Sequence, residues 1–235
     1  MIKPTLVTFT GADDSITAQA ILDVAKDYPD TEWGILFGAD DGGSRRFPSR
    51  GWIETNLPKL KGLNLSAHLC GRWVYDLVLR GDFTWLYHYP DEITSLFKRV
   101  QINFHGQNFG SEALSFHPRI AAEDYQFIFQ DDEVNLHIAG DLGGTKNVRL
   151  HDMSHGSGAL PKEGVWPKRT FKEYVGYAGG LGPDNIQAQL KLIEAAAQPE
   201  VYGPYWIDME TKVRSVRDSI FDMKKVRTVC EKVWD

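Results

Sequence analysis

Eight short runs rich in Val, Ile, Leu, Phe and Tyr alternate along this 235-residue chain with longer amphipathic or polar segments. The runs span residues 5–10, 33–37, 63–69, 100–104, 125–129, 148–150, 174–178 and 205–207. A short apolar run followed by a helical segment is typical of a βαβ unit, which places successive strands parallel in one sheet. Eight such strands predict an α/β fold of the (β/α)8 TIM-barrel type. We expect a single barrel domain over residues 1–235.

The segments between the strands predict the helices. A first helix with Ile16, Ala20, Ile21 and Val24 on one face is expected to be capped by Asp14 or Ser15. Further helices are expected at residues 51–60, 74–79, 112–119, 134–139, 183–197 and 221–233, and the 183–197 helix should carry proline in its first turn. An open, doubly wound sheet is the alternative architecture. Such a sheet normally has a glycine fingerprint after its first strand, and Gly11-Ala12-Asp13 does not match it.

Charge and composition narrow the possible partners. The formal net charge is −6, and Lys and Arg are scattered apart from Arg45, Arg46 and Arg50, so neither nucleic acid nor an anionic membrane is an expected partner. No apolar run is long enough to span a bilayer, and no signal segment is recognisable, so a cytoplasmic location is expected. Cys70 and Cys230 follow no metal spacing and are expected to be free thiols. The expected partner is a small phosphorylated molecule, with no cofactor, and nothing in the sequence specifies an oligomeric state.

Polar residues stand just past most of the predicted strands. In (β/α)8 barrels the ligand lies at the carboxyl ends of the strands, because the loops after the strands converge there. The residues at these ends are Thr10, Asp40, Asp41, His68, Cys70, Asn103, His105, Gln130, Asp131, Asp152, His155, Asp208 and Glu210.

The run Gly179-Gly180-Leu181-Gly182-Pro183-Asp184-Asn185 joins the seventh strand to a helix. Glycines at such a junction let backbone N–H groups approach an oxyanion, and the helix start adds partial positive charge. The loops after strands seven and eight frequently hold phosphate in these barrels. The run therefore predicts a phosphate site, and a tight turn with a helix cap is the alternative interpretation.

Several motifs, in order along the chain, resemble those of phosphoribosylanthranilate isomerase, a ribulose-phosphate-binding barrel of tryptophan biosynthesis. The run Ala178-Gly179-Gly180-Leu181-Gly182-Pro183-Asp184-Asn185 is similar to the family's Ala-Gly-Gly-Leu-Asn-Pro-Glu-Asn. The other similar stretches are Gly34 to Phe37 with Ser44-Arg45-Arg46, Asn103-Phe104-His105-Gly106, Leu150-His151-Asp152 with Gly156-Ser157-Gly158 and Trp166, and Ile207-Asp208 with Thr211, Val213 and Asp218.

The resemblance implies an Amadori-type isomerisation of an aminoaldose phosphate, which needs one acid and one base. It assigns the acid to Asp152, whose pKa burial would raise toward neutrality. It implies that Arg45 or Arg46 faces a substrate carboxylate, and that the substrate also contacts Asn103, His105, Gly156, Gly158 and Asp208. Phosphate would be held by Gly179, Gly180 and the Thr211 region.

The chain departs from the family pattern at two important places. Thr10 stands where the family has its catalytic cysteine, and a threonine hydroxyl is too weakly acidic to be a resting base. Glu210-Thr211-Lys212 replaces the family's Ser-Ser-Gly, so Lys212 is a candidate to supply charge to the phosphate.

The sequence leaves open which residue acts as the base and whether a metal ion is bound. His68 and Cys70 lie two residues apart on a strand and point the same way, so the imidazole could activate the thiol as a relocated base, or the pair could simply pack the barrel mouth. A metal site from His68, His105, Asp152, His155 and Asp208 is less favoured, because no His-x-His or Cys-x-x-Cys pair supports it.

Two function classes remain open. The chain is either an isomerase or lyase acting on a sugar phosphate, or a phosphate-binding barrel that has lost isomerase activity or uses another phosphorylated substrate.

Overall fold

The computed structural model is a closed barrel of eight parallel strands that pair in sequence order, with β8 returning to β1. The strands are β1 (Leu6–Thr10), β2 (Thr31–Phe37), β3 (Asn64–Leu69), β4 (Arg99–Ile102), β5 (Gln126–Gln130), β6 (Asn147–Asp152), β7 (Val175–Ala178) and β8 (Tyr205–Met209). The (β/α)8 barrel predicted from the alternation of elements is therefore confirmed.

The structure describes residues 1–38, 45–80, 82, 85, 88–104, 125–130, 147–152, 154 and 157–235. Its α-helices there are α1 (Ala18–Asp27), α2 (Arg50–Asn56), α3 (Arg72–Arg80), α5 (Asp91–Thr94), α8 (Ile186–Ala197), α9 (Pro199–Tyr202) and α10 (Met223–Trp234). The described residues also form three short 3-10 turns, η1 (Leu57–Leu60), η4 (Lys162–Gly164) and η5 (Thr211–Val213). They include a small hairpin of β9 (Arg214–Ser215) and β10 (Ile220–Phe221).

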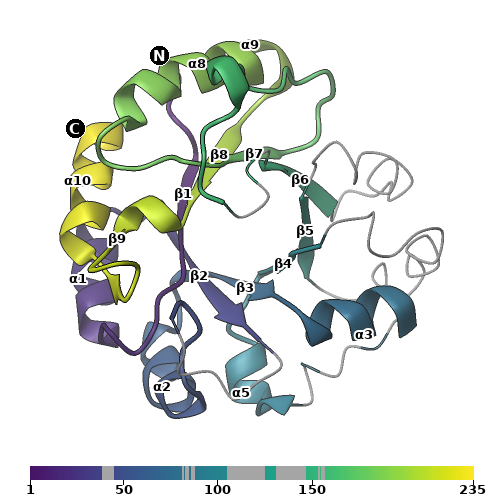
Figure 1. Cartoon of the computed structure of the whole chain (residues 1–235), viewed down its shortest axis with the longest axis vertical. Coiled ribbons are helices and arrows are strands. Elements are labelled where there is room, and N and C mark those ends of the chain that lie inside the picture. Colours follow the sequence, from purple (N-terminus) through teal and green to yellow (C-terminus); the bar gives the residue numbers. More distant parts are fainter. Residues whose placement is uncertain are drawn as a thin grey trace.

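The strands form a ring in the centre of the molecule and the helices surround it (Figure 1). The helices expected at residues 112–119 and 134–139 lie outside the described residues. Among the described helices, none has the length and hydropathy needed to cross a membrane.

Helix α1 begins one turn later than expected. Thr17 is its N-cap, and the Thr17 side chain accepts a hydrogen bond from the backbone N–H of Ala20. The predicted caps Asp14 and Ser15 were wrong, because both side chains are engaged elsewhere: Ser15 Oγ donates to Asp13 Oδ1, and Asp14 accepts from Ser49.

Helix α8 also begins later than expected. Asn185 precedes its first residue, Ile186, and the backbone N–H groups of both donate to the carbonyl of Gly182. The intervening turn leaves Pro183 ahead of the helix, so the prediction of a proline in its first turn was wrong.

The outward-facing strand residues pack against the helices, and the inward-facing ones divide the barrel interior into two halves. On the β5–β8 side the interior is apolar, formed by Ile128, Val148, Leu150, Ala178 and Trp206. Gly176 leaves the space that Trp206 fills, because a Cβ there would lie 2.3 Å from the indole ring.

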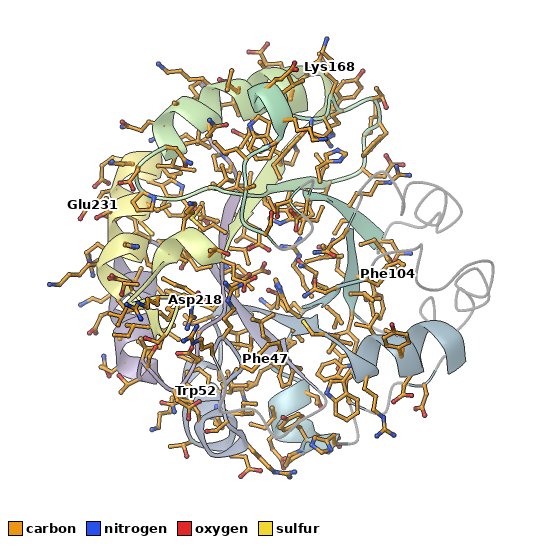
Figure 2. All side chains as sticks on the ribbon, in the orientation of Figure 1. Phe47, Trp52, Phe104, Lys168, Asp218 and Glu231 are labelled. Carbon is orange, nitrogen blue, oxygen red and sulfur yellow. The ribbon has the colours of Figure 1, made fainter. Side chains whose placement is uncertain are left out.

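On the β1–β4 side the interior is polar and buried. Glu32 accepts from Arg99 Nη1 at 2.9 Å and from Thr8 Oγ1 at 2.8 Å. The guanidinium carbon of Arg99 lies 4.3 Å from the ring centroid of Trp206, which joins the two halves. Side chains therefore fill the centre of the ring (Figure 2), and the ligand space lies at the carboxyl end of the strands.

Candidate functional site

A cavity of about 240 Å³ lies at the carboxyl ends of the barrel strands. It is lined from β1, β4 to β8 and the loops after β6, β7 and β8 by Thr10, Gln101, Asn103, Gln130, Leu150, Asp152, Ser154, Gly158, Ala178, Gly179, Gly180, Leu181, Asp208, Met209, Glu210, Thr211 and Lys212. The position is the one that the fold favours for ligands. Most of the lining residues have polar side chains or are glycines.

The loop after β7 forms one wall of this cavity. Gly179 and Gly180 have φ values of +112° and +68°, which favour glycine. Asn185 closes the loop, since its Nδ2 donates to the Gly180 carbonyl at 2.8 Å and its Oδ1 accepts from the Gly182 N–H at 3.0 Å. Within the described part of the chain, the N–H groups of Gly179, Gly180 and Leu181 donate to no protein acceptor.

The loops after β6 and β8 pack directly on this glycine run. A Cβ on Gly180 would lie 2.5 Å from the backbone nitrogen of Leu160, and a Cβ on Gly158 would lie 2.8 Å from the side chain of Thr211. Lys212 packs on Gly182 in the same way, because a Cβ on Gly182 would lie 2.4 Å from the Cβ of Lys212. One side of the cavity is therefore lined by Thr211, Lys212 and the N–H groups that have no protein partner among the described residues, and we call this set the cradle.

Two carboxyl groups line the floor beside the cradle, on either side of Ala178 in the strand register. Burial raises the pKa of the Asp208 carboxyl well above its usual range, although the Thr10 hydroxyl donates to its Oδ1 at 2.8 Å. Asp152 is differently placed, because Oδ1 accepts from both the N–H and the hydroxyl of Ser154, at 3.0 and 2.7 Å, and Oδ2 accepts from Gln130 at 3.4 Å.

His68 and Cys70 are both outside the cavity lining, and they do not form the predicted thiol–imidazole pair. His68 Nε2 lies 3.0 Å from Ser66 Oγ, and burial together with the charge of Arg99 lowers its pKa to about 3. Cys70 Sγ accepts from Asn103 Nδ2 at 3.1 Å, and burial raises the pKa of its thiol to about 12. Burial of Cys70 therefore opposes the thiolate that this hypothesis requires.

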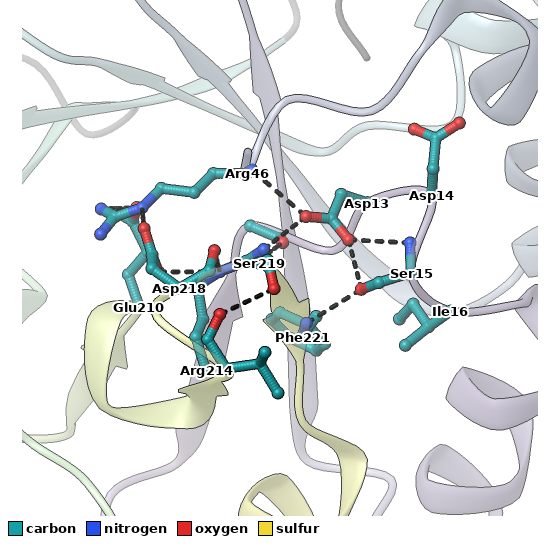
Figure 3. A network of polar contacts seen from close by, with 12 residues as sticks. Asp13, Asp14, Ser15, Ile16, Arg46, Glu210, Arg214, Asp218, Ser219 and Phe221 are labelled. Carbon is teal, nitrogen blue, oxygen red and sulfur yellow. Dashed lines mark hydrogen bonds and ion pairs between the residues drawn. The ribbon is translucent and has the colours of Figure 1, made fainter. Parts of the chain in front are cut away.

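A network of ion pairs lies at the rim of the barrel mouth (Figure 3). The Arg46 Nη1 atom lies 2.6 Å from Glu210 Oε1, and its Nε lies 2.6 Å from Asp218 Oδ2. The fully buried Arg214 pairs with Asp13 and Asp218, and its Nη1 donates to the Gly11 carbonyl at 2.6 Å. We call the side chains of Asp13, Arg46, Glu210, Arg214 and Asp218 the rim network.

The two arginines expected to meet a substrate carboxylate are placed differently. The Arg46 guanidinium is held by two protein carboxylates of the rim network, and Arg45 is exposed at the surface. Neither lines the cavity.

The structure thus gathers around one cavity most of the residues that the sequence singled out, namely Thr10, Asn103, Asp152, Gly158, Gly179, Gly180, Asp208, Thr211 and Lys212. His105, Gly156 and His155 lie outside the described residues. Among the described residues, no group of three or more His, Cys, Asp and Glu side chains is arranged to hold a metal ion.

Sequence reasoning missed Gln101, Ser154, Asp13 and Arg214. Gln101 had a readable signal, because it stands two residues before Asn103 on a strand and must share its face. The others had none, since their partners are distant in sequence or belong to a loop.

A closed ring of eight parallel strands with a cavity at their carboxyl ends defines a (β/α)8-barrel protein. No protein-family model matches the sequence, and no curated protein shows significant sequence similarity to it. Among solved structures, a truncated form of 3-deoxy-D-arabino-heptulosonate 7-phosphate synthase from Thermotoga maritima is similar over 97% of this chain and 84% of its own, with 10% identity and a TM-score of 0.52. A phospho-2-dehydro-3-deoxyheptonate aldolase from Thermotoga maritima is similar over 97% of this chain and 67% of its own, with 12% identity and a TM-score of 0.47. At this identity the likeness to the first structure supports the barrel fold alone.

Proposed function

We propose that this chain is a single barrel domain that binds a phosphorylated sugar at the barrel mouth and catalyses an acid–base isomerisation there. One observation carries the proposal. The cradle lies on the same cavity as two carboxyl groups, Asp152 and Asp208, whose environments differ.

The cradle supports a phosphate ligand. Three adjacent N–H groups, at Gly179, Gly180 and Leu181, have no protein partner among the described residues and suit an anion with several acceptor oxygens. Lys212 packs against the same glycine run at Gly182 and is not ion-paired within the described part of the chain. Its ammonium supplies the positive charge that the phosphate needs.

The floor supports proton transfer. Two titratable groups with unlike environments are the usual sign of an acid and a base in one site. Asp208 is buried and holds its proton more tightly than an ordinary carboxyl, so we assign it the role of proton donor. Asp152 accepts three hydrogen bonds, from Ser154 and Gln130, so we assign it the role of proton acceptor. This reverses the role that the resemblance implies for Asp152.

The two groups together account for a balanced isomerisation. Asp152 takes the proton from the carbon next to the sugar carbonyl while Asp208 gives its proton to the carbonyl oxygen, which forms an enediol. Returning a proton to the former carbonyl carbon and removing one from the neighbouring hydroxyl yields the ketose, and both carboxyl groups regain their starting states. Each transfer contributes about 10²–10⁴-fold to the rate when it is positioned in this way.

Deuterium exchange tests this proposal without knowledge of the natural substrate. The protein is incubated in D₂O with ribose 5-phosphate, glucose 6-phosphate or glucosamine 6-phosphate, and proton NMR follows loss of the C2 proton signal. We expect exchange with at least one sugar phosphate, and its loss by about 10²-fold or more in Asp152→Asn and in Asp208→Asn. Calorimetry with inorganic phosphate should show that both variants still bind the anion. Phosphate binding without exchange in any of the three would refute isomerisation of these sugars.

A second candidate function is a phosphate-ligand-binding barrel without isomerase activity. Thr10 favours it, because the hydroxyl that replaces the family's base donates its proton to Asp208 instead of accepting one. The deuterium experiment separates the two candidates, since a binding protein takes up phosphate but exchanges no carbon-bound proton.

A further inference from the structure

The side of the cavity opposite the cradle carries a hydrogen-bond acceptor without a donor. Gln101 Nε2 donates to Asn103 Oδ1 at 2.8 Å, and Asn103 Nδ2 in turn donates to Cys70 Sγ at 3.1 Å. The Gln101 side chain lines the cavity and the residue is only 4% exposed, yet its Oε1 has no partner among the residues that the structure describes. A buried acceptor left unpaired costs about 1–3 kcal/mol, so a donor on the ligand would be favoured here.

The Glu210 side chain belongs to the lining of the same cavity. Burial raises the pKa of its carboxyl group, and the charge of Arg46 and its hydrogen bond act against this. Arg46 donates a hydrogen bond to the Oε1 atom of Glu210, and the Oε2 atom accepts no hydrogen bond within the described part of the chain. One carboxylate oxygen is thus left for a ligand.

The charge around the mouth is unbalanced. In the rim network three carboxylates face two guanidinium groups, which leaves one negative charge in excess. Lys212 is the single cation in the described cavity lining, and it lies at the cradle. A phosphate bound at the cradle therefore leaves the side of Glu210 and Gln101 acidic.

We propose that Glu210 and Gln101 bind a protonated amino group of the ligand, so that the substrate class is an aminodeoxy sugar phosphate with a free amine. The inference rests on the proposed function, because the cradle must hold the phosphate end of the same molecule. An ammonium donates to the Gln101 Oε1 atom and pairs with Glu210, which satisfies the acceptor and the charge together. A substrate with an aromatic carboxylate on this side would instead meet Glu210, with the Arg46 guanidinium already occupied.

Calorimetry with two matched ligands tests the inference. Glucosamine 6-phosphate and glucose 6-phosphate differ in an ammonium against a hydroxyl at one carbon. At pH 6.5 we expect glucosamine 6-phosphate to bind about tenfold more tightly or better, as expected for one charge-assisted contact. N-acetylglucosamine 6-phosphate, which lacks the charge, should lose this advantage.

Three variants locate the effect. Glu210→Gln should reduce the preference for the amine over the hydroxyl to about twofold or less. Asp218→Asn removes the same charge from the same rim network but lies outside the cavity lining, so the preference should persist. Lys212→Met should weaken both ligands equally.

The outcomes distinguish this inference from the proposed function. Equal affinity of the two sugars, with both weakened by Lys212→Met, would overturn the amine site and leave the phosphate cradle intact. If the amine is preferred but Lys212→Met leaves the affinity for both ligands unchanged, the cradle would be overturned. Tighter binding of glucose 6-phosphate in the presence of Mg²⁺, abolished by Glu210→Gln, would overturn the amine in favour of a divalent cation. Binding of neither sugar would refute both proposals.

Discussion

Gly180→Ala is the substitution that most directly tests the construction of the cradle. Its φ of +68° costs an alanine about 1–2 kcal/mol. The new Cβ would also lie 2.5 Å from the backbone nitrogen of Leu160 and 2.7 Å from the carbonyl carbon of Ala159. Backbone atoms cannot rotate away as a side chain can, so overpacking adds about 1–3 kcal/mol. Movement of either loop would also displace the N–H groups of the cradle.

A matched control isolates the steric part of this effect. Gly164 has the same φ of +68°, but a Cβ there meets nothing within 4 Å. Gly164→Ala should therefore pay only the conformational cost, and Gly180→Ala should be less stable by about 1–3 kcal/mol. With a urea m-value of about 3 kcal/mol/M, the two unfolding midpoints should differ by about 0.3–1 M. Calorimetry with inorganic phosphate should show weakened binding in Gly180→Ala alone. Equal midpoints for the two variants would refute the close packing of the loops after β6 and β7.

Two further predictions concern buried charge. Burial raises the pKa of Asp208 in the folded protein above its value of about 3.9 in the unfolded chain, so the carboxyl reduces stability as pH rises from about 4 through its folded pKa. Asp208→Asn should therefore raise the urea midpoint at pH 7 and change it little at pH 3.5, and a lower midpoint at pH 7 would contradict the desolvation of this group. Arg214→Lys should cost about 3–5 kcal/mol of unfolding free energy, because the buried guanidinium pairs with two carboxylates that a lysine cannot join. Arg227→Lys, at a pair with Asp27 that is 39% and 50% exposed, is the control and should cost about 1 kcal/mol or less; similar losses in both would argue against the buried network.

The strands were predictable because each is a short apolar run between longer amphipathic or polar segments. Their ends were not predictable to the residue. The run at 148–150 becomes the strand Asn147–Asp152, and the run at 205–207 becomes Tyr205–Met209. These extensions are made by pairing with neighbouring strands, such as Asp152 with Ala178 and Met209 with Phe9. The sequence around a strand end does not show which distant residue will pair with it.

The site was predictable as a set of strand-end residues but not as a set of roles. The cradle glycines have a local signature, and the structure gives Gly179 and Gly180 the backbone conformations that require glycine. The occupation of Arg46 has no such signature, because its partner Asp218 lies 172 residues away. The environments of Asp152 and Asp208 likewise depend on loops and on Thr10 from the far end of the chain.

Thr10 and the buried carboxyl of Asp208 are parts of one arrangement. The Thr10 hydroxyl donates to Asp208 Oδ1 and so satisfies one carboxyl oxygen without neutralising the charge. Gly34 makes room for this contact, because a Cβ there would lie 2.5 Å from Thr10 Oγ1 and 2.8 Å from His68 Nε2. Burial is the largest influence on the pKa of Asp208, and the charges of Glu210, Glu32 and Asp152 act in the same direction, so the protonated form of the carboxyl is favoured. The hydrogen bond from Thr10 lowers the pKa of Asp208 and burial raises it, and the effect of burial is the larger of the two.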